Sequence, residues 1–319
     1  MTRPAPRGAA RRRRAWAALV ALALCGVVAG AAPLRAAEAA VFATPEAALS
    51  AFADALNGPD GQGLLALLGP EHRDEFLGGD PAAVRQGLAL LKVAAAQDLR
   101  LVAQGQDRMT VILGRQAWPM PIPLVRSEQG WRFDTAAGLE EIIDRRIGRN
   151  ELAAIELARA YADAQATYAS EDRDGDEVLE YAQKLASTPG QRDGLHWPLG
   201  DDGEDSPLAA FAARAAEYLG YRQEGEPYRG YQFRILTEQG PNPPGGAYDY
   251  VINGNMIAGF ALVAWPADHG NSGVMTFALS HQGKLYQKDL GPDTAGIAEA
   301  MTRYDPDASW TEVDEEALP

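Results

Sequence analysis

The segment from Tyr228 to Gly291 constrains the fold of this chain more than any other part of its sequence. Aromatic and β-branched residues alternate there in short runs that end at Gly or Pro: YRGYQFRILTEQG, AYDYVING, MIAGFALVAWP, SGVMTFALS and KLYQKDLG. This pattern is typical of an antiparallel sheet, and Asn253-Gly254 predicts a hairpin turn between Val251 and Ile257. The segment holds two His, no Cys and no clustered carboxylates. We therefore expect a scaffold there and not a reaction centre.

The first 39 residues have the three parts of an export signal. Arg11–Arg14 form a basic region, Ala15–Ala32 form an apolar run, and Ala37-Glu38-Ala39 is an A-x-A cleavage pattern. We expect cleavage after Ala39 and a periplasmic or secreted protein. Without cleavage, the same apolar run would anchor the chain in the inner membrane. Cys25 is the single cysteine and lies within the signal, so disulfides and zinc-thiolate sites are not expected.

The charge of the chain restricts its partners. The formal net charge is −15 at pH 7, and removing the seven arginines and one glutamate that precede Ala39 makes it −21. A body this acidic repels nucleic acid and anionic membrane surfaces. We expect no nucleic-acid partner, and membrane contact only through an uncleaved signal.

A length of 319 residues favours two domains of roughly 150 residues each. Residues 41–143 predict an α+β domain in which helices precede an antiparallel meander. Its expected helices begin at Thr44-Pro45-Glu46, Leu64 and Asp80-Pro81, and its expected strands are Leu99–Ala103, Met109–Leu113, Trp118–Val125 and Trp131–Phe133. This order of elements resembles the NTF2-like or cystatin-like fold.

Residues 144–310 predict a second α+β domain, in which a long helix packs on the antiparallel sheet. The expected helices are Ile147–Ser170, Tyr181–Ser187, Ser206–Tyr218 and Asp293–Tyr304. Residues 311–319 read as an acidic tail, which we expect to fray from Glu312 onward.

Long motifs carry a resemblance to a known family. They are RRIGRNELAAIELARAYADAQATYASEDRDGDEVLEYAQKLAS, GLHWP, PYRGYQFRIL, GGAYDYVINGNMIAGFALVAWP, SGVMTF and YQKDLG. From about Phe42 to Trp310 the chain is similar to the bacterial family catalogued as domain of unknown function 2950. The resemblance implies an exported bacterial protein with no assigned activity. The long helix, the DxDGD turn and the following sheet also resemble a pilin or pseudopilin headgroup. The corresponding helix here is internal, so polymerisation by the usual pilin route is not expected.

An acidic turn gives one candidate site. Asp172, Asp174, Asp176 and Glu180 offer the carboxylate oxygens that calcium prefers. The pattern departs from an EF-hand at Glu177, where Gly is expected, and at Gln183, where the bidentate Glu should stand. The alternative is a solvated turn whose Asp side chains cap the next segment. Calcium is the one cofactor that the sequence suggests.

A second candidate site is catalytic. Asp193 and His196 could form a His–Asp couple, with Tyr228 adding a hydroxyl in a cleft between the two predicted domains. The alternative is a structural His beside Trp197. The chain has four His, none at H-x-x-x-H spacing, so a His-rich zinc site is not expected.

The tryptophans give a third candidate. Trp131, Trp197, Trp265 and Trp310 could line a carbohydrate or peptide groove, or could belong to the core. Because no nucleophile–base set is evident, the sequence favours a non-enzymatic envelope protein that binds or assembles with an envelope protein or small ligand. The alternatives are a periplasmic enzyme of unknown reaction and a calcium-stabilised pilin-like headgroup.

Overall fold

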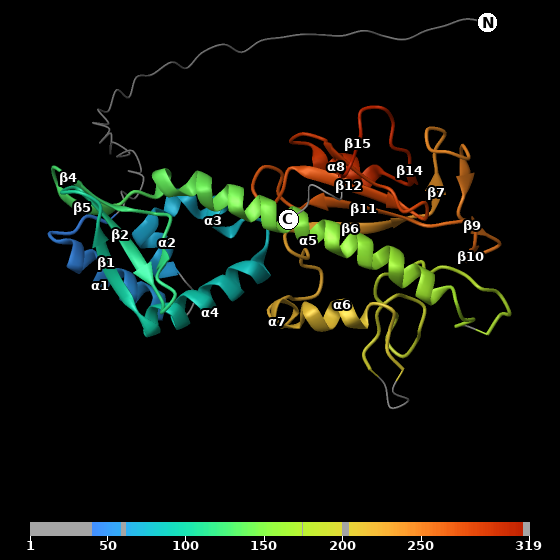
Figure 1. Cartoon of the computed structure of the whole chain (residues 1–319), viewed down its shortest axis with the longest axis horizontal. Coiled ribbons are helices and arrows are strands. Elements are labelled where there is room, and N and C mark those ends of the chain that lie inside the picture. Colours follow the sequence, from blue (N-terminus) through green and yellow to red (C-terminus); the bar gives the residue numbers. More distant parts are fainter. Residues whose placement is uncertain (1–39, 59–61, 174, 200–203, 315–319) are drawn as a thin grey trace, which may run out of the picture. The chain divides into compact units, whose positions relative to one another are not determined.

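The computed structural model describes residues 40–58, 62–173, 175–199 and 204–314. Helices and antiparallel sheets occur together, which confirms the predicted α+β class (Figure 1). All described residues belong to one compact unit, Ala37–Pro319, that holds two hydrophobic cores. The predicted signal at 1–39 lies outside the described residues. None of the described helices has both the length and the apolar character needed to cross a membrane.

The first core lies between helices and a small antiparallel sheet. Its elements are α1 (Pro45–Asn57), α2 (Gln62–Leu68), η1 (Pro70–His72), α3 (Arg73–Leu77), α4 (Pro81–Gln97), β1 (Leu99–Ala103), β2 (Arg108–Leu113), β3 (Trp118–Pro119), β4 (Leu124–Ser127) and β5 (Gly130–Phe133). The sheet order is β1-β2-β4-β5, with β3 also paired to β2. The predicted helix starts at Thr44-Pro45-Glu46 and Asp80-Pro81 are confirmed, and both are capped: the side chain of Thr44 accepts from the N–H of Ala47, and that of Asp80 accepts from the N–H of Ala83.

The predicted strand Trp118–Val125 is wrong in its middle. Trp118–Pro119 and Leu124–Val125 pair with β2, and the residues between them form no strand. Pro119, Pro121 and Pro123 alternate through this stretch. Proline has no N–H to donate to a ladder, so the chain leaves the sheet between β3 and β4.

The helix α5 (Thr135–Tyr168) has 34 residues and packs against both hydrophobic cores. The prediction that it begins at Ile147 is wrong, since the helix starts twelve residues earlier and passes through the expected domain boundary at Asp144. Ile142 packs against the first core, whereas residues from Ala154 onward are buried in the second. Whether 41–143 and 144–310 are separate domains stays a prediction.

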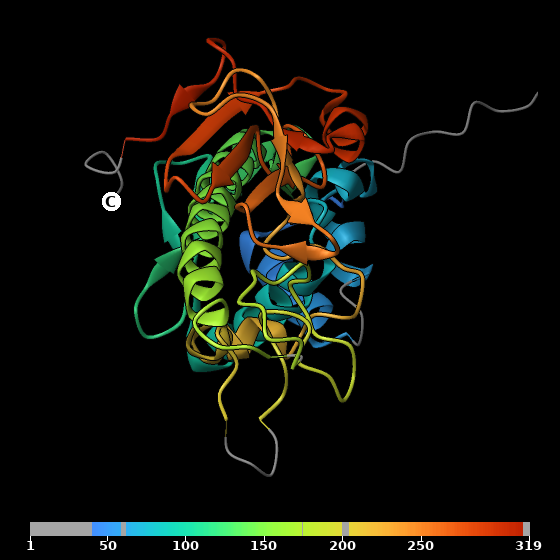
Figure 2. The ribbon, with the colours of Figure 1, turned by 90° about the vertical axis from the view of Figure 1, so that its right-hand side faces the viewer.

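The second core lies on both faces of a five-stranded antiparallel sheet (Figures 1 and 2). In order, its strands are β15 (Thr311–Glu312), β13 (Leu285–Asp289), β12 (Met275–Ser280), β11 (Ala261–Pro266) and β6 (Tyr231–Leu236). Successive side chains of a strand face opposite sides of the sheet. Phe277 lies on the side of α5, beside Ile155. Arg234 lies on the other side, where it reaches the carbonyls of Ala298 and Met301 at the end of α8 (Thr294–Ala300).

The predicted strand run forms two further small sheets besides the main one. In the first, β14 (Arg303–Tyr304) pairs in parallel with β7 (Glu238–Gln239), which pairs with β8 (Tyr248–Asp249). In the second, β9 (Val251–Ile252) and β10 (Asn255–Met256) form a hairpin. The turn prediction there is confirmed, because Asn253 and Gly254 both have positive φ, 52° and 100°.

Four predictions for the C-terminal half are wrong, wholly or in part. Residues 181–187 are not helical, because their N–H groups bond to distant carbonyls, as from Tyr181 to Met256. The last helix ends at Ala300, and the next residues turn into β14. The expected fraying from Glu312 is also wrong at its start: Thr311–Glu312 pair with β13, and the N–H of Val313 donates to Leu285. The helix expected to end at Tyr218 is split into α6 (Ala209–Arg214) and α7 (Ala216–Leu219).

Polar contacts connect the start of α4 with α7 and the segment that follows α7. The Tyr218 hydroxyl lies 3.0 and 3.2 Å from the two carboxylate oxygens of Asp80, whose side chain is fully buried. The N–H of Arg229 donates to the same hydroxyl at 2.9 Å. Arg85 bonds to the carbonyl of Tyr221 at 2.7 Å and to the Glu226 carboxylate. These bonds fix the start of α4 against the second half of the chain.

Candidate binding site

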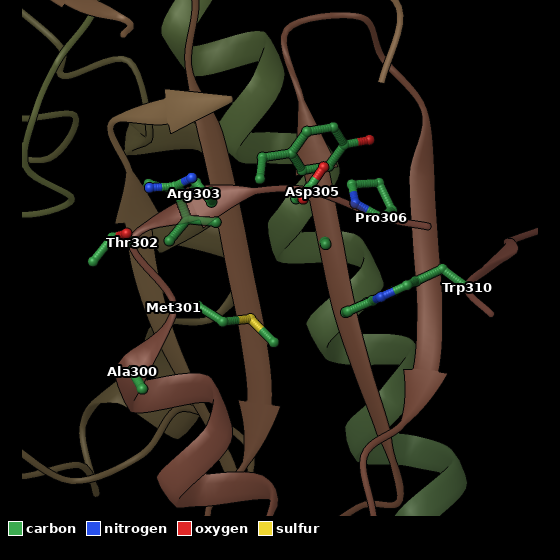
Figure 3. Close-up of a pocket in the computed structure, with 10 residues that line it drawn as sticks. Ala300, Met301, Thr302, Arg303, Asp305, Pro306 and Trp310 are labelled. Carbon is green, nitrogen blue, oxygen red and sulfur yellow. The ribbon is translucent and has the colours of Figure 1, made fainter. Parts of the chain in front are cut away.

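A cavity of about 280 Å³ lies on the face of the large sheet that is turned away from α5 (Figure 3). Leu236 of β6 and Ala278 of β12 contribute sheet side chains to its lining, together with Met301 and Trp310. Met301 and Trp310 reach toward the same space from opposite sides, whereas the guanidinium of Arg303 extends away (Figure 3).

Local interactions bring each wall into place. Arg234 donates to the carbonyls of Ala298, at 3.0 Å, and Met301, at 3.2 Å, and thereby satisfies the C-terminal end of α8. The chain then enters β14 and pairs with β7. On the other side, Lys288 of β13 donates to the hydroxyl of Ser309 at 2.7 Å. This bond fixes the loop that places Trp310 at the edge of the cavity.

The charged side chains of the cavity wall are engaged within the protein. Arg303 pairs with Glu238 at 3.3 Å. One oxygen of Asp305 accepts from both the backbone N–H and the side-chain amide of Asn242, each at 2.9 Å. Burial raises the pKa of Tyr304 to about 12, so its hydroxyl stays neutral at ordinary pH. Apolar atoms form the larger part of the surface that remains for a guest, beside a smaller polar part.

Asp193, the first residue of the predicted catalytic set, organises its own loop. Its carboxylate accepts from the N–H of Thr188 at 2.7 Å and from the Thr188 hydroxyl at 2.9 Å, and it also pairs with Lys184. The Lys184 ammonium is the largest cause that lowers the pKa of Asp193 to about 2. The carboxylate is therefore fully ionised and closes a surface turn.

The other two residues of that set lie in different surroundings. The backbone of His196 forms a bridge with Ala186, and burial lowers the pKa of its imidazole. Tyr228 packs against Phe211, Tyr218 and Phe233 with ring centroids 5.6, 5.3 and 6.3 Å away. In the part of the chain that the structure describes, no hydrogen bond joins Asp193, His196 and Tyr228.

The acidic turn uses several of its carboxylates to order the backbone. Asp172 accepts from the N–H groups of Gly175, at 2.8 Å, and Glu177, at 3.0 Å. Asp176 accepts from the N–H of Val178 and the amide of Asn255. Glu180 accepts from the N–H of Met256.

Asp174, the fourth predicted calcium ligand, lies outside the described residues. Across 40–58, 62–173, 175–199 and 204–314, no group of three or more His, Cys, Asp or Glu side chains is arranged to hold a metal. Calcium binding by the complete turn stays a prediction.

The four tryptophans do not form one groove. Trp131 is buried in the first core, and Trp197 and Trp265 are buried in the second. Arginines cover both of the latter rings: the guanidinium carbon of Arg173 lies 5.5 Å from the ring centre of Trp197, and that of Arg234 lies 5.6 Å from the ring centre of Trp265. Trp310 alone of the four lines the described cavity. Sequence analysis missed Met301, because no local pattern indicates that it faces Trp310.

Comparison with known proteins gives one match. Residues 39–313 match the family model described as "Protein of unknown function (DUF2950)". No curated protein and no solved structure matches the chain. The resemblances to NTF2-like folds and pilin headgroups therefore stay predictions.

Proposed function

The chain belongs to this family of unknown function, and from that premise we propose that it is an exported envelope protein that acts by binding and not by catalysis. The observation that carries the proposal is the cavity between Met301 and Trp310. Its charged side chains are engaged by Glu238 and Asn242, and apolar atoms form the larger part of its open surface. Such a surface can retain a partner, whereas its one carboxylate, that of Asp305, is already held by Asn242.

The surroundings of the catalytic candidates also support binding. A general base needs a pKa near the working pH, whereas Lys184 holds the pKa of Asp193 at about 2. Tyr228 is packed among aromatic rings, and burial raises the pKa of its hydroxyl. Neither group is prepared for acid–base work at neutral pH.

Export is the second part of the proposal, and it is supported by the basic, apolar and A-x-A segments of residues 1–39. Cell fractionation and N-terminal sequencing of the isolated protein test it directly. We expect a periplasmic or secreted chain that begins at Ala40. Recovery of the intact N-terminus from the cytoplasm would contradict export.

Binding is tested by affinity capture from an envelope extract. Wild-type protein and the variant Trp310→Ala serve as baits, with Trp118→Ala as the matched control, since Trp118 lies on β3 and is 41% exposed. We expect Trp310→Ala to lose a specifically captured species that Trp118→Ala retains. A hydrolase screen that finds turnover abolished by Asp193→Asn or His196→Ala would overturn the non-enzymatic proposal.

A further inference from the structure

We infer that His281 is an acid-sensitive contact: its neutral imidazole holds β8 against the end of β12, and protonation of that imidazole loosens β8. His281 directly follows β12, and its side chain contacts Tyr248, Tyr250 and Phe260. This contact does not depend on the proposed binding function, and only its effect on the cavity wall does.

The imidazole of His281 lies among aromatic rings and backbone. Its ring centre is 5.5 Å from that of Tyr250 and 6.2 Å from that of Phe260, at interplanar angles of 83° and 72°. A Cβ atom at Gly259 would lie 2.7 Å from Nδ1, so the backbone of Gly259 lies directly against this nitrogen. Nδ1 is buried and has no hydrogen-bond partner among the described residues. Nε2 lies 3.4 Å from the Tyr248 hydroxyl, which is longer than a usual hydrogen bond.

These surroundings suit the neutral imidazole and not the cation. A neutral imidazole carries one N–H, which can lie on Nε2 beside Tyr248 and leave Nδ1 without a proton. The imidazolium carries an N–H on both nitrogens, so protonation places a charge and a second donor where the described residues offer no acceptor. Burial accordingly lowers the pKa of His281. The contribution of this contact to stability is therefore complete above a pH of about 6.5, the ordinary pKa of His, and is lost as the pH falls from there through the lowered folded-state pKa.

The charged and titratable groups nearby do not offset this cost. Asp249 lies on the other face of β8 from the two tyrosines and is exposed. The ammonium of Lys284 is bonded to Glu312 at 2.9 Å. The Tyr250 hydroxyl already donates to a side-chain amide at 3.2 Å. Of the described residues, none contributes a charge that changes the pKa of His281.

β8 connects this contact with the candidate cavity. β8 pairs with β7, and β7 pairs with β14, whose residues Arg303 and Tyr304 line the cavity. Gln239 of β7 also accepts from the Tyr250 hydroxyl. Because β8 keeps these bonds when His281 is protonated, we expect local loosening and not unfolding. Acid should therefore loosen the strands that support one wall of the cavity.

Two measurements on the wild-type protein test the inference. The first is the NMR titration of the His281 imidazole, identified by its contacts with the Tyr250 ring, and we expect a midpoint below the ordinary value of about 6.5. The second is hydrogen exchange of the Tyr250 amide, which donates to the carbonyl of Thr237 at 2.8 Å. Between roughly pH 7 and pH 5 its protection factor should fall, by up to about tenfold for each unit by which the midpoint lies below 6.5.

Variants then locate the effect. His281→Gln has no side chain that titrates in this range, so the Tyr250 amide should lose this pH dependence. His269→Gln is the matched control, because His269 lies in the loop at the other end of β12 and pairs with Asp289. This control should keep the pH dependence of the wild type.

The outcomes decide the inference without reference to binding. A midpoint at or above 6.5 would overturn it, because the aromatic rings would then stabilise the cation. So would a Tyr250 protection factor that stays constant in the wild type or falls equally in His281→Gln. Should His281→Gln fail to fold, the two wild-type measurements decide alone. The Trp310-dependent capture from envelope extract tests the proposed function separately.

Discussion

Loss of the Tyr218 hydroxyl should destabilise the protein by an amount that follows from its surroundings. This hydroxyl is fully buried, lies 3.0 Å from a carboxylate oxygen of buried Asp80, and accepts from the N–H of Arg229. Burial and the Asp80 charge raise the pKa of Tyr218 far above its usual value, so it remains a proton donor at every accessible pH. Tyr218→Phe removes the donor to the buried Asp80 carboxylate and leaves the part-buried N–H of Arg229 without its acceptor.

The magnitude follows from these two losses. A hydrogen bond to a charged group contributes about 1.5–3 kcal/mol, and a buried group left unsatisfied costs about 1–3 kcal/mol. The two terms overlap, so we expect a loss of about 3 kcal/mol in the free energy of unfolding. At roughly 2–4 °C per kcal/mol for a chain of this size class, the melting temperature should fall by about 6–12 °C.

Urea denaturation followed by circular dichroism measures this loss. The control is Tyr221→Phe, because Tyr221 is a nearby, partly buried tyrosine that bonds to Arg85 and Tyr218 through its backbone. We expect the midpoint to fall for Tyr218→Phe and to stay unchanged for the control. Asp80→Asn combined with Tyr218→Phe should cost less than the sum of the single changes. A loss below about 0.5 kcal/mol for Tyr218→Phe, near the limit for ordinary surface substitutions, would refute the reasoning.

Three further predictions concern other parts of the chain. Gly138→Ala should destabilise the protein by about 2 kcal/mol, because the added Cβ would lie 2.7 Å from the backbone carbonyl oxygen of Pro121. Gly148→Ala should stabilise it by about 0.5–1 kcal/mol, because no atom lies within 4 Å of the added Cβ. Thermal melts of the two variants check this, and equal changes in melting temperature would contradict it. Asp193 contributes stability that is present above pH 4 and lost as the pH falls through about 2, because its folded pKa is lowered. The difference in unfolding free energy between wild type and Asp193→Asn, under about 1 kcal/mol for this surface pair, should therefore shrink in acid, and a constant difference would refute the argument. If the acidic turn binds calcium, millimolar calcium should raise the melting temperature of the wild type but not of Asp172→Ala/Asp176→Ala, and no shift in the wild type would end that prediction.

Elements whose signals are local were predicted well. The strand Leu99–Ala103 is confirmed at both ends, as is the Asn253-Gly254 hairpin. The helix starts at Thr44-Pro45 and Asp80-Pro81 are confirmed as well, because a capping side chain and a following proline act within one turn of helix.

Elements that depend on residues far away in the sequence were not predicted well. The segment 181–187 was expected to be helical, yet the N–H groups of Tyr181 and Ser187 bond to the carbonyls of Met256 and His196. The end of the last helix is decided by Arg234 of β6, which binds the carbonyl of Met301 and so allows the next residues to join β7. No short-range sequence pattern predicts these hydrogen bonds between distant segments.

The candidate site shows the same division. The sequence by itself determined the class of fold, the family, the acidic surface and the presence of Trp310, since all of these follow from composition, periodicity and motifs within short windows. Only the tertiary structure decided that Trp310 faces Met301 across a cavity, that Trp131, Trp197 and Trp265 are buried elsewhere, and that Asp193 is held by Lys184. The physical reason is that cavities and ion pairs arise where strands and loops far apart in the chain cross, and no pattern along the chain records those crossings.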